Sequence, residues 1–226
     1  NSFIRSKVFS KIDYFIPVLP IEYDLISKNK YFNAKLLMER GVFRDIDESK
    51  FSLYVPSAEG NILLGNSATF TNNHLDIIGQ LKDVNIQNRK IIVPLNYGVN
   101  KYAELIKNNV DSRYHLLTDY LEYSDYEKLV GTCSYAIFGP IRQQSMGNIN
   151  MCFFKGIKIF LYSDSLIYKQ LKRDGYKVFS IEMDLNEEEL RTPLSYNDMI
   201  HNQEVNRSIT KKNGFKGLNE SLQNLA

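Results

Sequence analysis

The 226-residue chain has few cysteines, little net charge and no long apolar run. Its two cysteines, Cys133 and Cys152, fall inside short apolar segments, which predicts buried free thiols of a cytoplasmic protein rather than a disulfide or a metal pair. The formal net charge of +2 gives no strong field, so no nucleic-acid partner is expected. The sequence shows neither an apolar stretch of membrane-spanning length nor a signal peptide.

Several catalytic motifs are absent as well. No Asp-x-Asp pair follows an expected strand, so neither a bound metal nor another cofactor is expected. The absence of a P-loop argues against nucleotide hydrolysis, and the absence of a Gly-x-Gly-x-x-Gly run argues against a nicotinamide dehydrogenase. No Ser-His-Asp or Cys-His arrangement is apparent, so no catalytic residue is assigned.

What the chain does have is a regular alternation of expected strands and helices within an ordinary globular composition. The alternation predicts an α/β fold with a Rossmann-like parallel sheet flanked by helices. Strands are expected at residues 61–64, 90–94, 114–117, 134–138, 157–161 and 177–181. Helices are expected at residues 73–83, 100–109, 123–131, 147–155, 164–173 and 186–190, with one or two more in the tail around Lys212-Asn213-Gly214.

The first 60 residues are less regular. A helix is expected over residues 21–37, a charged loop over 39–50 and a strand over 51–55. The first 30 residues mix basic, aromatic and apolar side chains, which indicates either a helix and an arm packed on the domain or an exposed surface near a membrane or lipid acceptor. Because Arg5, Lys7 and Lys11 do not share one helical face, the packed arrangement is favoured.

The most informative segment is Arg142-Gln143-Gln144-Ser145-Met146-Gly147-Asn148, between an apolar strand and an apolar helix. A helix start offers unpaired N–H groups and the positive end of the helix dipole, which suit a phosphate. The guanidinium of an arginine can bind two phosphate oxygens, and a glycine lets the backbone approach a ligand. The alternative is that these polar residues only cap the helix.

A second strand leads into a similar polar loop. Asn66, Ser67, Asn73 and His74 lie in the segment that follows the expected strand at 61–64. Thr71 or Asn72 is expected to cap the following helix, and His74 to offer a ligand a hydrogen bond. Because the loops that follow parallel strands meet at the carboxyl edge of the sheet, both segments are expected to face one ligand there.

Four motifs occur here in one order: Gly65-Asn66-Ser67, Asn72-Asn73-His74, Ile91-Ile92-Val93-Pro94-Leu95-Asn96-Tyr97-Gly98, and Arg142-Gln143-Gln144 through Gly147. The series resembles the bacterial TDP-N-acetylfucosamine:lipid II N-acetylfucosaminyltransferase family, also called 4-alpha-L-fucosyltransferase-like, of enterobacterial common antigen synthesis. The resemblance covers roughly residues 60–185. The chain departs from the family pattern at Ala68-Thr69-Phe70 and at Ser145-Met146-Gly147, which bears on the identity of the donor sugar.

The resemblance implies the C-terminal, donor-binding half of a GT-B glycosyltransferase, in a fragment that lacks most of the N-terminal domain. Residues 1–57 would form an arm with helices, residues 58–196 a Rossmann-like nucleotide-sugar-binding domain, and residues 197–226 a helical tail. The resemblance also places Asn96, Tyr97 and Tyr123 near the donor. Each has a structural alternative, since Tyr97 could cover the sheet end, and Ser124 or Asp125 could cap the helix that starts near Tyr123. Ser163 or Asp164 could touch the sugar or cap the helix that follows.

The expected reaction moves an amino-deoxy sugar from a dTDP-sugar to a lipid-diphosphate-linked or glycan acceptor, without a metal, on the cytoplasmic side and in peripheral contact with the inner membrane. The donor-binding residues are then Asn66, Ser67, Asn73, His74, Asn96, Tyr97, Tyr123 and the segment from Arg142 to Asn148. The alternative is a non-catalytic module that binds a nucleotide or a sugar.

Overall fold

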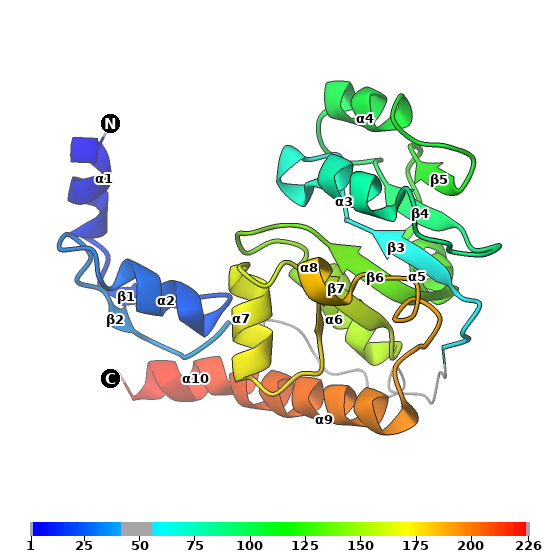
Figure 1. Ribbon diagram of the computed structural model, residues 1–226. Helices are drawn as coiled ribbons and strands as arrows, with labels where there is room; N and C mark the ends of the chain where they lie inside the picture. Colours follow the sequence, from blue (N-terminus) through cyan, green and yellow to red (C-terminus); the bar gives the residue numbers. More distant parts are fainter. Residues whose placement is uncertain (1, 42–55, 225–226) are drawn as a thin grey trace. The chain divides into compact units, whose positions relative to one another are not determined.

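The computed structural model describes residues 2–41 and 56–224 (Figure 1). The chain divides into two compact units, one made of residues 1–47 with 204–226 and the other of residues 48–203. The sequence analysis expected domain boundaries after residues 57 and 196, and these boundaries stay predictions. The strand expected at 51–55 and most of the charged loop at 39–50 lie outside the described residues.

The larger unit is built on a six-stranded parallel sheet in the order β5-β4-β3-β6-β7-β8. The alternation seen in the sequence is confirmed, although the last strand is shorter than the expected 177–181. The strands are β3 (Asn61–Leu64), β4 (Ile91–Pro94), β5 (Tyr114–Leu117), β6 (Cys133–Phe138), β7 (Lys158–Leu161) and β8 (Phe179–Ser180).

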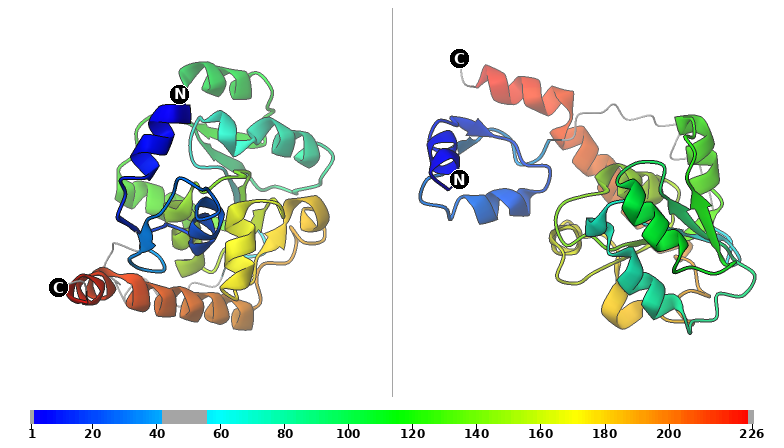
Figure 2. Two further views of the ribbon diagram at one scale, coloured as in Figure 1. Left: turned by 90° about the vertical axis from the view of Figure 1, so that its left-hand side faces the viewer. Right: turned by 90° about the horizontal axis from the view of Figure 1, so that it is seen from above.

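Helices connect these strands and cover both faces of the sheet (Figures 1 and 2). One face carries α3 and α4, whose buried Ile77, Leu81 and Ile106 pack in a core cluster with Ile62 and Val93 of the strands. Right-handed crossovers place α5, α6 and α7 on the opposite face. The helices are α3 (His74–Leu81), α4 (Asn100–Lys107), α5 (Tyr123–Val130), α6 (Met146–Phe154), α7 (Leu166–Arg173) and α8 (Ile181–Asp184).

The helix expected at residues 186–190 is wrong, because this segment forms turns after α8. Two buried cations take its carbonyl groups, which an extended helix would use for its own hydrogen bonds. Arg89 donates to the carbonyl oxygen of Leu190, and Lys158 Nζ donates to that of Glu189 at 2.9 Å. Satisfying two buried cations therefore overrides local helix preference here.

The smaller unit contains α1 (Ser2–Phe9), β1 (Tyr14–Phe15), α2 (Pro20–Ile26) and β2 (Lys35–Leu36), with β1 and β2 paired in parallel. The helix expected over 21–37 ends at Ile26, because the buried ring of Phe32 turns inward to an edge contact with Phe15. At the C-terminus, Gly214 separates α9 (Tyr196–Asn213) from α10 (Phe215–Gln223), so the expectation of one or two helices in the tail is confirmed, with two present.

The strand order places a topological switch point between β3 and β6. From β3 the chain moves outward through β4 to β5, and it then returns to place β6 on the other side of β3. The connections that leave the carboxyl ends of β3 and β6 therefore run to opposite faces. In open α/β sheets, ligands bind in the crevice that such a divergence opens.

Candidate functional site

Two polar loops leave the sheet at this switch point. We call residues 65–73, which follow β3, the first polar loop, and residues 139–145, which follow β6, the second polar loop. The first loop leads through a short 3-10 turn, Phe70–Asn72, into α3, and the second leads directly into α6. The sequence expectation that both loops share the carboxyl edge is therefore confirmed.

Side chains join the two loops directly. The Nδ2 atom of Asn73 donates to the Gly139 carbonyl oxygen at 2.7 Å, and Ser145 Oγ donates to Asn66 Oδ1 at 2.9 Å. Gln144 spans the gap, because its Oε1 accepts from Thr71 Oγ1 at 2.6 Å while its Nε2 donates to Thr69 Oγ1 at 3.1 Å. The loops thus form one connected polar surface, in which hydrogen bonds link the side chains of Asn66, Thr69, Thr71, Gln144 and Ser145.

Each loop ends in a left-handed residue directly before its helix. Asn73 has φ 51° and Ser145 has φ 64°, and neither side chain caps its helix. The expected caps Thr71 and Asn72 are wrong, since both lie around the 3-10 turn instead. Asn72 is buried, and its Nδ2 holds the loop by donating to the Ser67 carbonyl oxygen at 2.8 Å. A left-handed conformation in a non-glycine residue costs energy and is enriched at ligand sites.

Two glycines allow this close packing of the first loop against the strand ends. A Cβ atom at Gly139 would collide with the main-chain oxygen of Asn72, and one at Gly65 would collide with His74 Nε2. Gly65 also has φ +68°, which side chains rarely adopt. The sequence placed these glycines in the motifs, but their role appears only in three dimensions.

His74 does not lie where the sequence analysis expected it. Its side chain is fully buried as the first residue of α3, with Nδ1 at 3.4 Å from the Tyr102 hydroxyl. Burial lowers the pKa of the imidazole from 6.5 to about 4, so the ring is neutral near neutral pH. The ring packs close to Gly65, and the expected hydrogen bond from His74 to a ligand stays a prediction.

A cavity of about 420 Å³ opens beside the joined loops. It is lined by Thr71 and Asn73 of the first polar loop, by Ile141 and Arg142 of the second polar loop, and by Leu166 at the start of α7. Such a volume is sufficient for a small ligand. Within the described chain, the Arg142 guanidinium forms no ion pair, and its Nη1 donates to the Gln143 carbonyl oxygen at 3.2 Å.

Sequence reasoning missed three residues of this cavity. Thr71 was expected only as a cap, Ile141 was passed over between Pro140 and Arg142, and Leu166 was read only as part of a helix. The sequence signal for Ile141 was an apolar residue within a polar loop, and in the structure its side chain is 48% exposed. The position of Leu166 could not be inferred, since it depends on the packing of β7 beside β6.

The remaining expected site residues are spread along the same edge. Asn96 and Tyr97 are exposed after β4, where a backbone bridge between Ala68 and Gly98 joins that connection to the first polar loop. Tyr123 is exposed at the start of α5, which follows β5, so β4 separates it from the switch point. Their contact with a ligand stays a prediction.

The expected site residues from Gln143 to Asn148 differ in exposure and in their hydrogen bonds. Asn148 Oδ1 accepts from the Tyr126 hydroxyl at 2.9 Å, so this oxygen serves helix packing. Gly147 is exposed, with open space in front of it. Gln143 and Met146 are partly exposed. The exposed glycine in the first turn of α6 leaves the helix backbone accessible from solvent.

Two further capping expectations are wrong. Ser165, rather than Ser163 or Asp164, caps α7 by accepting from the Tyr168 amide at 3.0 Å. The N-cap position of α5 is Glu122, ahead of the expected Ser124 and Asp125. Ser163 is held instead by Glu182, to whose Oε1 its hydroxyl donates at 3.1 Å.

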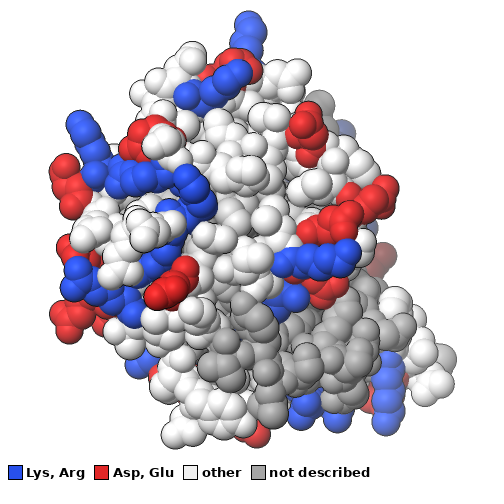
Figure 3. Space-filling model, turned by 90° about the vertical axis from the view of Figure 1, so that its right-hand side faces the viewer, with Lys and Arg blue, Asp and Glu red and all other residues white. Residues whose placement is uncertain are grey.

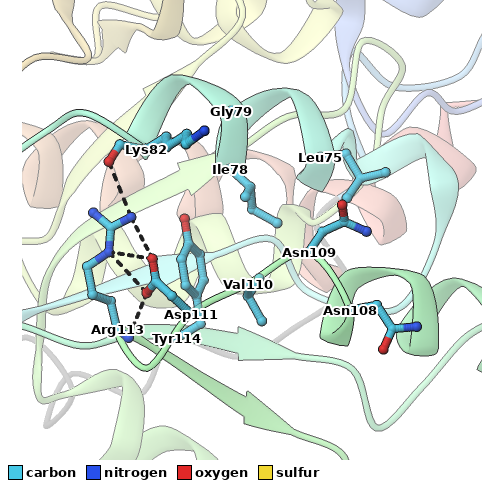
Figure 4. A pocket seen from close by; sticks show the side chains of 10 residues that line it. All are labelled: Leu75, Ile78, Gly79, Lys82, Asn108, Asn109, Val110, Asp111, Arg113 and Tyr114. Atoms are coloured by element: carbon cyan, nitrogen blue, oxygen red, sulfur yellow. Dashed lines mark hydrogen bonds and ion pairs between the residues drawn. The ribbon is translucent and has the colours of Figure 1, made fainter.

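A second cavity, of about 460 Å³, lies between α3 and the start of β5 (Figure 4). Its arginine, Arg113, forms an ion pair with Asp111 at 2.8 Å and donates to the carbonyl oxygens of Leu81 and Lys82, both at 3.3 Å. These bonds satisfy the last carbonyls of α3, which explains Arg113 structurally. The Tyr114 hydroxyl is buried without a hydrogen-bond partner among the residues that the structure describes, and burial raises its pKa to about 12.

The charge distribution shows no field of one sign. On the face drawn in Figure 3, lysines and arginines lie beside aspartates and glutamates. Within the described ranges, no three side chains of the metal-ligating types cluster together. None of the helices described here has the length and apolarity that would let it cross a membrane.

Comparison with protein families identifies one match. The family model described as "4-alpha-L-fucosyltransferase glycosyl transferase group 56" matches residues 31–208, which is more than half of the chain. The matched range contains both polar loops and the cavity that they line with Leu166.

Among the solved structures with a similar fold are two glycosyltransferases. A glycosyltransferase from Rickettsia africae ESF-5 is 14% identical with a TM-score of 0.63, covering 99% of this chain and 68% of that one. AviGT4, involved in avilamycin A biosynthesis, is 8% identical with a TM-score of 0.54, covering 89% and 67%. The GtfA/B complex is 9% identical with a TM-score of 0.56, and the match covers 100% of this chain and 47% of that one. These likenesses show a GT-B-like α/β fold.

Proposed function

Because the chain belongs to glycosyl transferase group 56, the 4-alpha-L-fucosyltransferase family, we propose that its switch-point site holds the nucleotide-sugar donor of a sugar transfer. The proposed reaction moves an amino-deoxy sugar, similar to N-acetylfucosamine, from a dTDP-sugar to a lipid-diphosphate-linked or glycan acceptor. This would serve the synthesis of a bacterial surface polysaccharide. The general base that activates the acceptor would come from another domain, so none is assigned here.

The observation that carries the proposal is Arg142, which lines the 420 Å³ cavity from the loop that leads into α6. The first hydrogen bond of that helix runs from the Ile149 amide to the Ser145 carbonyl at 2.9 Å, which leaves the amides of residues 146–148 for a ligand. These amides, the helix dipole and the guanidinium would stabilise the negative charge that develops on the leaving diphosphate.

The walls of the cavity suit the sugar. Ile141 and Leu166 offer apolar surface for a deoxygenated carbon, and Thr71 and Asn73 offer polar groups for ring substituents. The cavity thereby combines an anion-binding end with a mixed sugar-binding wall. This arrangement supports a deoxy sugar as donor within the proposed reaction.

A peripheral contact with the cytoplasmic face of the inner membrane belongs to the same proposal. In the smaller unit, α1 exposes Ile4 by 60% and Val8 by 55%, and both line a shallow hollow with Lys7 and Lys11. Exposed aliphatic side chains beside lysines suit an anionic lipid surface.

Titration calorimetry with dTDP tests the donor site. We expect Arg142→Ala to weaken binding by about 1.5–3 kcal/mol, the range for hydrogen bonds to charged groups, and Arg142→Lys to weaken it less because a point charge remains. Arg191→Ala is the matched control, since that arginine is exposed and pairs with Glu187 away from the switch point. Equal affinity in the parent and Arg142→Ala would remove the assignment. Binding without turnover in the full enzyme would favour a non-catalytic module.

A further inference from the structure

The hydrogen bonds around Gln144 determine what kind of ligand group the cavity accepts. Resting on the proposed donor site, we propose that Gln144 fixes Thr71 as a hydrogen-bond acceptor, so that the cavity selects a sugar with a donating O–H or N–H group at that position. Thr71 is then a specificity-determining residue, and Gln144 is the positioning residue behind it.

The first step concerns the single proton of the Thr71 hydroxyl. Its Oγ1 donates to Gln144 Oε1 at 2.6 Å, a short bond for two neutral groups. A hydroxyl has one proton and two lone pairs, so a committed proton leaves only acceptor capacity. Thr71 is exposed and lines the 420 Å³ cavity. What it presents to a ligand is therefore an acceptor.

The second step concerns the orientation of the Gln144 amide. Its Nε2 donates to Thr69 Oγ1 at 3.1 Å and to Asn66 Oδ1 at 3.4 Å. Asn66 Oδ1 is itself an acceptor, because Ser145 Oγ donates to it at 2.9 Å. A flipped Gln144 amide would set two acceptor oxygens against each other at Asn66. The bond from Ser145 to Asn66 thus favours the Gln144 orientation in which Nε2 faces Asn66 and Oε1 accepts from Thr71.

The third step concerns the rest of the cavity wall. Asn73 Nδ2 uses one of its two hydrogens on the Gly139 carbonyl oxygen at 2.7 Å, and its Oδ1 is a second acceptor beside Thr71. Arg142 carries donors only. The lining therefore combines a cation for an anion, acceptors for a donating group, and the apolar Ile141 and Leu166. A diphosphate-linked sugar with a hydroxyl or amide N–H matches this combination.

Fluorinated sugars separate donating from accepting groups. In dTDP-glucose, replacing one hydroxyl by fluorine nearly preserves size but removes the donor. We expect one ring position at which fluorine weakens binding to the parent protein by roughly tenfold or more, since a site built for a polar group rejects its absence. The same substitution at other positions should change affinity by less than about threefold.

Four variants then locate the cause. Thr71→Val should abolish the fluorine penalty, whereas Thr71→Ser, which keeps the hydroxyl, should retain it. Gln144→Leu frees the Thr71 proton and should reduce the penalty to less than about threefold. Gln144→Glu keeps an acceptor towards Thr71 and should retain the penalty as a ratio, although its second oxygen faces Asn66 Oδ1 and should lower the affinity for both sugars. A merely structural role of Gln144 would lower the affinity for both sugars equally and leave their ratio unchanged.

The outcomes distinguish this inference from the proposed function. If the parent protein binds no dTDP, both fail together. If dTDP binds and Arg142→Ala weakens it, but no fluorine position carries a penalty, or the penalty persists in Thr71→Val and Gln144→Leu, only the inference about Thr71 fails. Far-UV circular dichroism and melting temperatures that match those of the parent show that the Thr71 variants are folded.

Discussion

At the scale of single residues, the first polar loop and the first residue of α3 contain buried polar atoms that lack partners within the described structure. Asn72 and His74 are both fully buried, and Asn72 Oδ1 and His74 Nε2 have no hydrogen-bond partner in the described structure. Such groups cost free energy, which a chain tolerates where packing around a site fixes them. His74 supports the loop below Gly65, and its charge state should therefore affect stability.

His74 predicts a loss of stability in mild acid. Its pKa is about 4 in the folded protein and 6.5 when exposed, so between these values the unfolded chain binds more protons. Stability from this group is complete above pH 6.5 and is lost as the pH falls towards 4. We expect the free energy of unfolding to drop by about 2 kcal/mol between pH 7 and pH 5 through this residue. Urea denaturation at both pH values measures it.

A non-titrating variant provides the control. His74→Gln should be less stable than the parent at pH 7, because a packed imidazole is lost, yet it should lose about 2 kcal/mol less between pH 7 and pH 5. Carboxylates that titrate in the same range affect both proteins alike. Identical slopes in the two proteins would show that His74 is not the group responsible.

At the scale of elements, the sequence predicted the strands well because buried parallel strands are short apolar runs between turn residues. It predicted both polar loops for the same reason. It could not predict the left-handed conformation of Asn73, the 3-10 turn before it or the turns at 186–190. Asn73 bonds to Gly139, and the residues after α8 accept hydrogen bonds from Arg89 and Lys158, all of which are distant in the chain.

Alanine variants of two glycines with positive φ distinguish the cost of backbone strain from the cost of a steric collision. Gly65 has φ +68° and Gly175 has φ +90°, but only a Cβ at Gly65 would meet another group, His74 Nε2. Gly175→Ala should cost about 1–2 kcal/mol of unfolding free energy through its backbone conformation alone. Gly65→Ala should cost about 1–3 kcal/mol more through overpacking. Comparison of both variants by denaturant unfolding tests this, and equal losses would mean that His74 yields without cost.

At the scale of the whole molecule, the charge distribution offers little long-range attraction for the proposed donor. The net charge is +2, and basic and acidic side chains are interspersed on the face shown in Figure 3. The attraction for a diphosphate must therefore come from groups next to it, within a Debye length of about 8–10 Å. Arg142 and the start of α6 are the groups that the fold places together at the crevice.

Local stabilisation of this kind predicts that dTDP binding persists without divalent metal. A metal that bridged the two phosphates would need oxygen ligands from the protein, and the cavity wall offers the neutral Thr71 and Asn73 with the cationic Arg142. Calorimetry in EDTA should give a dissociation constant within about twofold of that in magnesium, since the arginine and the helix amides carry the interaction. Arg142→Ala should show the same loss in both buffers. Binding that disappears in EDTA and returns with magnesium or manganese would mean that a metal, rather than Arg142, neutralises the diphosphate.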